Sequence, residues 1–158
     1  MKLFLAVASA AMIVSLAQAQ TAYVDVPSCH WAVEAINQVS AGDKPTPAQS
    51  AGNAQNAVRQ VFEGLQCGDP AWTQQFIVGA PSSLEALVKS KPIRGFALNF
   101  GLTVVNGRAA TILVDISLTL PSGIQKRSAT LTLSSDAKAA WRVNYASLAA
   151  LSIAVFPK

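Results

Sequence analysis

The chain has 158 residues, 51% of them apolar, with only 13% charged residues and a formal net charge of +4 at pH 7. This length suits one domain with a core of ordinary size. The basic residues are scattered, whereas nucleic-acid binders carry a dense basic patch with interleaved aromatic residues. We therefore expect no nucleic-acid partner.

Residues 1–19 have the pattern of a signal peptide. Lys2 gives a basic start, Leu3–Leu16 is apolar or small throughout, and Ala17-Gln18-Ala19 is a small-x-small cleavage signal. The apolar run is shorter than the ~20 residues of a membrane-spanning helix, and no later stretch is long and apolar enough. We expect an exported protein (secreted, periplasmic or in the cell envelope) without a membrane span, starting at Gln20.

Two cysteines, Cys29 and Cys67, remain after the predicted cleavage. In an oxidising compartment an even number of cysteines suggests a disulfide, and two cysteines allow one pairing. The alternatives are two inert thiols, or a reactive or metal-bound pair that includes His30. Neither cysteine has the spaced Cys and His partners of a zinc site. We therefore expect a Cys29–Cys67 disulfide, no metal and no cofactor.

The only histidine, His30, lies in the stretch YVDVPSCHWAVEAINQVSAG. Pro27 disfavours a helical conformation in the residue before it, and apolar residues from Trp31 onward recur at helical spacing, so a short helix follows an extended lead-in. Residues 23–40 resemble the first half of an S-layer homology repeat. The second half, which carries a T-R-A-E-like helix start, is absent. His30 and Trp31 are interpreted as packing residues, with contact to cell-wall glycan as the alternative; we regard wall anchoring as doubtful.

Three helices are predicted after a Gly-, Pro- and Ser-rich linker at residues 41–52. The first carries an apolar stripe from Ala54 to Leu65 and ends at Cys67-Gly68. The second begins at Asp69-Pro70, with the carboxylate as its cap. The third begins at Ser82, where Ser82 and Glu85 form a capping-box pattern, and runs to about Lys89.

The remainder alternates apolar and polar residues, which predicts four antiparallel strands with one buried face. The expected inward residues are Phe96, Leu98, Phe100, Leu102 and Val104; Ile112, Val114, Ile116, Leu118 and Leu120; Ala129, Leu131 and Leu133; and Trp141, Val143 and Tyr145. A three-residue loop, Val105 to Gly107, aligns the apolar faces by pairing Phe100 with Ile112. A four-residue loop, Pro121 to Ile124, pairs Ile116 with Ala129.

Helices followed by a meander predict an α+β domain over residues 53–158, with the helices packed on one face of a curved four-stranded antiparallel sheet. The stretches AVRQVFEGLQCGDPAWTQQF and AAWRVNYASL give residues 50–150 a resemblance to the nuclear transport factor 2-like superfamily, whose cystatin-like α+β cone encloses a pocket. Some members use that pocket for catalysis, and others only bind or dimerise. Fold alone does not supply the function.

The expected function is that of an exported, non-catalytic binding or accessory module. The inward strand residues carry no carboxylate, because Asp115 alternates onto the opposite face, so we expect no enzyme. The residues proposed to line an apolar ligand pocket are Trp72, Phe76, Phe100, Trp141 and Tyr145, with core filling as the favoured alternative. A homodimer through the polar sheet face is a further option. The alternative functions are a small-molecule isomerase or hydrolase, and a wall-associated protein.

Overall fold

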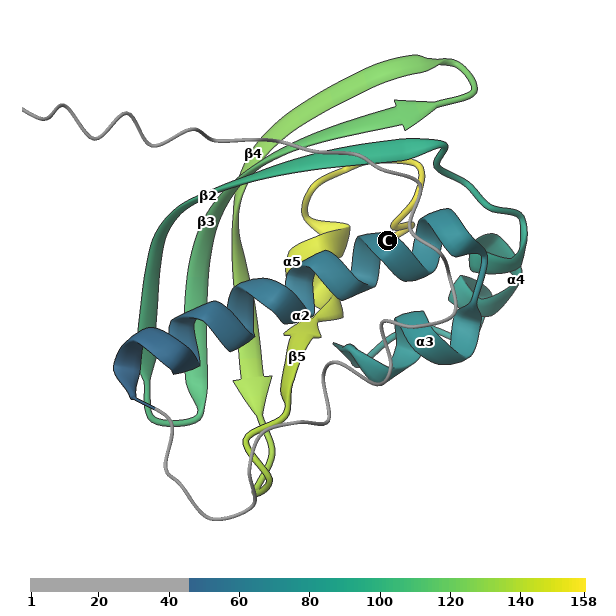
Figure 1. Ribbon diagram of the computed structural model, residues 1–158. Helices are drawn as coiled ribbons and strands as arrows, with labels where there is room; N and C mark the ends of the chain where they lie inside the picture. Colours follow the sequence, from purple (N-terminus) through teal and green to yellow (C-terminus); the bar gives the residue numbers. More distant parts are fainter. Residues whose placement is uncertain (1–45) are drawn as a thin grey trace, which may run out of the picture.

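The computed structural model describes residues 46–158, which fold as helices against a curved five-stranded sheet. The elements in chain order are α2 (Pro47–Cys67), α3 (Pro70–Gln75), β1 (Ile77–Val78), α4 (Ser83–Lys89), β2 (Gly95–Asn106), β3 (Ala109–Leu120), β4 (Gly123–Ser135), β5 (Trp141–Asn144) and α5 (Tyr145–Ala149). The strand order is β1-β5-β4-β3-β2. Figure 1 shows α2 lying across one face of this sheet. The α+β class is as predicted.

The helix boundaries follow local capping chemistry. Asp69 caps α3 by accepting a hydrogen bond from the backbone N–H of Trp72 at 3.0 Å, and Pro70 occupies the first turn. Gly68 ends α2 in the left-handed conformation, with φ 72°. These two boundaries match the sequence prediction. Ser82 does not, because it precedes α4 without a side-chain capping hydrogen bond.

α2 begins within the segment that the sequence suggested was a linker. Thr46 and Gln49 form a capping box: the Gln49 N–H donates to the Thr46 hydroxyl at 3.2 Å, and the Thr46 N–H donates to the Gln49 side chain at 2.8 Å. Pro47 follows the cap at the first helical position. Residues 47–52 are therefore helical. Most of them are small residues that are also typical of linkers, which is why the sequence suggested a linker here.

The sheet is mixed and has five strands, not the predicted four antiparallel ones. Ile77 and Val78 form β1, which pairs in parallel with Val143 and Asn144 of β5. The chain then turns into α5 at Tyr145, so Tyr145 is the first residue of a helix and not part of a strand. A two-residue strand has no periodicity of its own, so its pairing depends on contacts made after the chain has folded.

Both predicted registers are wrong, although the predicted core face of β3 is correct. Phe100 pairs with Val114, and Ile116 pairs with Arg127. The β2–β3 turn contains only Gly107 and Arg108, with Gly107 at φ 59°, as the first central position of a tight hairpin turn requires. A shift of two residues leaves every side chain on its original face, so the hydrophobic pattern cannot detect it.

A β-bulge in β2 changes which residues face the core. Register shifts between Phe100 and Thr103, so two residues of β2 lie opposite one of β3. Leu102 and Val104, both expected to point inward, are 72% and 48% exposed. Thr103 is half-buried instead and accepts a hydrogen bond from the Gln55 side chain of α2 at 2.9 Å.

The core lies between the sheet and α2, and is closed by α5 and the C-terminal residues. Three aromatic contacts link these parts: Phe62 with Phe96 (5.8 Å between ring centroids), Phe62 with Phe156 (5.9 Å), and Tyr145 with Phe156 (6.3 Å). No helix in residues 46–158 is long and apolar enough to cross a membrane.

Candidate functional site

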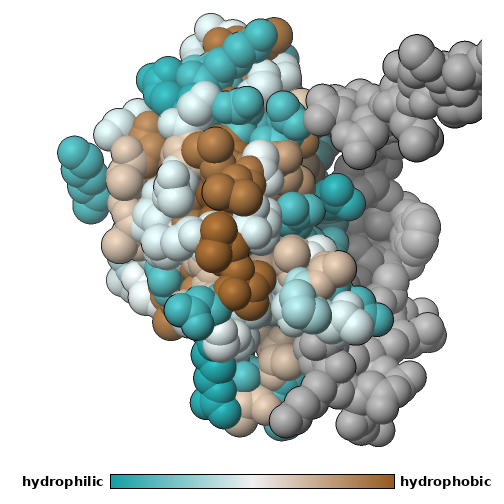
Figure 2. All heavy atoms as spheres, turned by 90° about the vertical axis from the view of Figure 1, so that its left-hand side faces the viewer, coloured by the Kyte–Doolittle hydropathy of each residue, from teal (hydrophilic) through white to brown (hydrophobic). Residues whose placement is uncertain are grey.

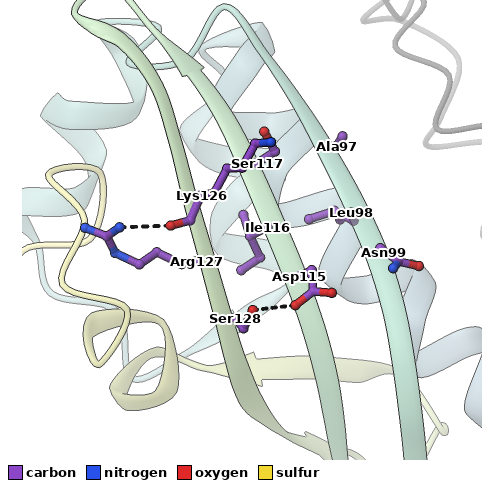
Figure 3. Close-up of a pocket in the computed structure, with 9 residues that line it drawn as sticks. All are labelled: Ala97, Leu98, Asn99, Asp115, Ile116, Ser117, Lys126, Arg127 and Ser128. Carbon is purple, nitrogen blue, oxygen red and sulfur yellow. Dashed lines mark hydrogen bonds between the residues drawn. The ribbon is translucent and has the colours of Figure 1, made fainter.

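A hollow of about 460 Å³ lies on the outer face of the sheet, opposite the helices. Figure 3 shows it spread over β2, β3 and β4. It is lined by three consecutive residues from each strand, namely Ala97, Leu98 and Asn99; Asp115, Ile116 and Ser117; and Lys126, Arg127 and Ser128. The hollow therefore lies on the sheet face away from the helices, whereas the sequence suggested a pocket between the helices and the sheet.

Strand register brings the polar side chains into two rows. Asn99 pairs with Asp115, which pairs with Ser128; one row further, Ala97 pairs with Ser117, which pairs with Lys126. Leu98 and Ile116 alternate with these residues and point toward the core, so they contribute mainly backbone to the hollow. The outer face at this position is consequently polar.

The hollow presents one carboxylate and one ammonium group. The Ser128 hydroxyl donates a hydrogen bond to the carboxylate of Asp115. Arg127 turns away from Asp115 and donates to the backbone carbonyl of Lys126 at 2.8 Å. Within the described part of the chain, the ion pair is Lys89–Glu85, so neither Asp115 nor Lys126 is neutralised by a described residue of opposite charge. As far as residues 46–158 are concerned, both charges are available to a ligand.

Apolar side chains lie on the same outer face, next to the hollow. Leu102, Val104 and Leu113 are 72%, 48% and 48% exposed, and the bulge in β2 is what turns the first two outward. Leu113 covers Gly101, where an added Cβ would lie 3.3 Å from a Leu113 methyl carbon. Figure 2 shows a vertical band of apolar surface on this side of the molecule. A contiguous exposed apolar patch with polar residues at its rim is typical of contact surfaces.

The residues predicted to line an apolar ligand pocket lie in the core. Trp72, Phe76, Trp141 and Tyr145 are buried, with at most 8% of each exposed, and Phe100 is half-buried and packs against the core. The Tyr145 hydroxyl donates to the carbonyl of Pro157 at 2.7 Å, and burial raises the pKa of this phenol. The ligand-binding role of these residues stays a prediction.

A buried polar contact joins α2 to α3. The indole N–H of Trp72 donates to the side-chain oxygen of Gln60 at 2.9 Å. Glu63, one turn along α2, is half-buried. Burial raises its pKa, while the nearby Arg59 and a hydrogen bond with Gln60 act in the opposite direction. This cluster stabilises the contact between the helices and lies outside the hollow.

Several predicted residues fall outside the described range. The signal peptide, His30, Trp31 and Cys29 all lie in residues 1–45. Cys67 is the last residue of α2 and is half-buried. Residues 46–158 contain no group of three or more His, Cys, Asp or Glu side chains placed to hold a metal ion.

The sequence placed Asp115 on the outer face of the sheet but did not predict a ligand-binding site on that face. Asn99, Ser128 and Lys126 were not singled out, although strict alternation assigns each of them to the same face as Asp115. Their proximity depends on the register of the hairpins, which the sequence did not predict correctly. The hollow could therefore be found only from the structure.

No protein-family model matches the sequence, and no curated protein matches it either. Several solved structures match, and two of them are described here. A nuclear transport factor 2-like superfamily protein from Salmonella enterica serovar Typhimurium is 12% identical, with a TM-score of 0.43 over 62% of this chain and 88% of that chain. A SEC-C motif containing protein from Psychrobacter arcticus is 15% identical, with a TM-score of 0.45 over 60% of this chain and 59% of that chain.

Proposed function

We propose that this protein is an exported, non-catalytic binding module that recognises an extended polypeptide segment through the hollow on its outer sheet face. The observation that carries the proposal is the pair of unneutralised charges in the hollow, Asp115 and Lys126. The chain's single histidine, His30, lies outside the described residues, so the Ser128–Asp115 pair has no described histidine to complete a Ser-His-Asp relay.

The spacing of the two charges selects the ligand class. Lys126 lies diagonally across β3 and β4 from Asp115, because Asp115 pairs with Ser128, two residues further along β4. Such diagonal neighbours are about 7–8 Å apart. Side chains two residues apart in an extended peptide lie on one face and are separated by roughly 7 Å. An extended segment with a basic and an acidic residue at positions i and i+2 therefore matches the hollow.

The polar and apolar parts of the outer face have complementary roles in this proposal. Asn99 and Ser117 supply hydrogen-bonding groups beside the charges, and Leu113 supplies an apolar surface at one end. An open, polar recess gives modest affinity, because water competes for each hydrogen bond and salt screens exposed charges. We expect binding of this segment to weaken as salt increases.

The test uses N-acetylated, C-amidated lysyl-alanyl-glutamate as a probe, followed by the backbone amide shifts of the labelled protein in NMR. We expect shifts at Asn99, Asp115 and Lys126 that saturate with the peptide, and loss of saturation in Asp115→Asn and Lys126→Gln. The side chains of Asp115 and Lys126 are both exposed, so these substitutions should leave the fold intact. A blocked trialanine peptide is the control.

Two outcomes would overturn the proposal. Saturating shifts confined to the surroundings of Trp72 and Trp141 would favour a site between the helices and the sheet. The absence of saturation at the hollow would show that the peptide does not bind there.

A further inference from the structure

We infer that β2 is a self-association edge, at which two copies of this chain join their sheets by antiparallel pairing of residues 96–100. β2 is the last strand of the sheet and pairs on one side only, with β3. Among the described residues, no backbone hydrogen bond from Gly95 to Asn106 reaches a segment other than β3. Within residues 46–158, β2 therefore presents a row of unpaired N–H and C=O groups along its free edge.

The sequence of β2 lacks the features that protect edge strands from pairing. GFALNFGLTVVN contains no charged residue and no proline over its whole length. Lysine and proline at an edge are the usual means of preventing strand addition. The bulge after Phe100 interrupts regular pairing in the second half of the strand, and α2 reaches Thr103 there through Gln55. Residues 96–100, in the regular half, are left as the surface for pairing.

The core is incompletely covered along this same edge. Core-facing residues of β3 such as Val114, Ile116 and Leu118 are at most 2% exposed. Their partners in β2, which are Phe100, Leu98 and Phe96, are only half-buried, although they pack against the same core. A further strand beside β2 would cover these side chains, so its addition is favoured by apolar burial as well as by backbone hydrogen bonds.

A second copy fits this edge because the strand is nearly symmetric about Leu98. Antiparallel pairing around a two-fold axis at Leu98 sets Phe96 opposite Phe100 of the second copy, and Ala97 opposite Asn99 of the second copy. The core face then has two aromatic pairs flanking a Leu98 pair, which is a favourable cross-strand arrangement. The absence of charged residues from this segment favours the pairing, because a charged side chain near the axis would lie close to the identical charge of the second copy.

This arrangement differs from the sheet-face homodimer considered from the sequence. It extends the sheet sideways and leaves the outer faces of both copies open to solvent. The hollows of the two copies would lie on the same face of one continuous sheet, with Ala97 and Asn99 between them. A partner with two suitable segments would then bind with higher apparent affinity than a single segment.

The test is a pair of matched double variants at outward-facing positions of the edge, with mass measured by light scattering over a concentration series. Ala97→Lys/Asn99→Lys sets lysine opposite lysine twice in each dimer, and Ala97→Glu/Asn99→Lys sets glutamate opposite lysine. We expect the natural protein to approach twice the monomer mass. The Lys/Lys variant should weaken association by roughly tenfold, since each like-charge pair costs about 0.2–1 kcal/mol, and the Glu/Lys variant should retain it. Equal thermal unfolding of both variants verifies that they fold.

Leu113→Lys distinguishes edge pairing from face-to-face packing, because Leu113 lies on the outer face but not at the edge. Edge pairing predicts that this variant still forms dimers. Loss of dimers in Leu113→Lys, with retention in the Lys/Lys variant, would overturn the inference in favour of a sheet-face dimer. A natural protein that stays monomeric at every concentration would also overturn it. The readout is molecular mass and not peptide binding. A result that contradicts the edge dimer therefore leaves the proposed peptide binding untouched.

Discussion

The Nε1 of Trp72 donates a hydrogen bond to Oε1 of Gln60 at 2.9 Å, and only 4% and 5% of these two residues are exposed. This contact joins the short helix α3 to the middle of α2 within the apolar core. A buried polar group is expensive to leave without a partner, so the two side chains depend on each other.

Trp72→Phe should lower the free energy of unfolding by about 1–3 kcal/mol through the unpartnered Gln60 oxygen, in addition to the loss of packing. Urea denaturation measures this change. In Trp72→Phe/Gln60→Leu both polar partners are removed, so we expect the double variant to be more stable than the sum of the single losses predicts. Strict additivity of the two losses would show that the hydrogen bond makes no net contribution.

Gly64→Ala should destabilise the contact between α2 and α3. An added Cβ would overlap the hydroxyl oxygen of Thr73 and lie 3.0 Å from the Thr73 backbone nitrogen. Because that nitrogen belongs to α3 and cannot move independently of it, the helices must separate, and such overpacking costs about 1–3 kcal/mol. Thermal unfolding is the measurement, with Gly52→Ala as the control, since nothing lies within 4 Å of an added Cβ at that position. A Gly64→Ala protein as stable as the natural one would contradict the close approach of the helices.

Glu63 should make stability fall as pH rises. Burial raises the pKa of its carboxyl in the folded protein above the ordinary value of 4.5, so folding favours the protonated form. That contribution is fully present below the unfolded pKa and is lost as pH rises through the folded pKa. Glu63→Gln should therefore be more stable than the natural protein at neutral pH, with the difference disappearing in acid.

Glu85 provides a control of opposite sign in the same experiment. Its hydrogen bond and ion pair with Lys89, on the next turn of α4, lower the pKa of this exposed carboxyl. Its small contribution is therefore present above the unfolded pKa and is lost as pH falls through the folded value. Chemical denaturation of natural protein, Glu63→Gln and Glu85→Gln at several pH values separates the two effects. A stability difference for Glu63→Gln that is independent of pH would show that its carboxyl is not perturbed.

The Cys29–Cys67 disulfide remains a prediction, since Cys29 lies outside the described residues. We expect no thiol to react in the purified protein when it is denatured without reductant. The bond would close a loop of about 39 residues and stabilise the fold by roughly 4 kcal/mol in the chain-entropy model. Cys29→Ser/Cys67→Ser should therefore melt at a lower temperature. One reactive thiol per molecule would rule out the bond and favour the alternative of a reactive Cys29-His30 site.

The sequence by itself determined three of the helices, four of the five strands and which face of most strands is buried. Period-two alternation assigned Val114 and Ile116 to the core and Asp115 to the outer face, because the pleat fixes side-chain direction residue by residue. Capping chemistry set the boundary between α2 and α3 in the same way, since Gly68 and Asp69 act through their immediate neighbours. Each of these features is local.

Only the tertiary structure decided the register, the bulge and the fifth strand. Registers that differ by two residues bury the same faces, so the choice depends on turn geometry and on packing between strands. The bulge then turned Leu102 and Val104 outward, and the register brought Asp115 and Lys126 into one hollow. β1 exists because Ile77 meets Val143, far along the chain. These features arise from contacts between distant segments, which no local pattern in the sequence encodes.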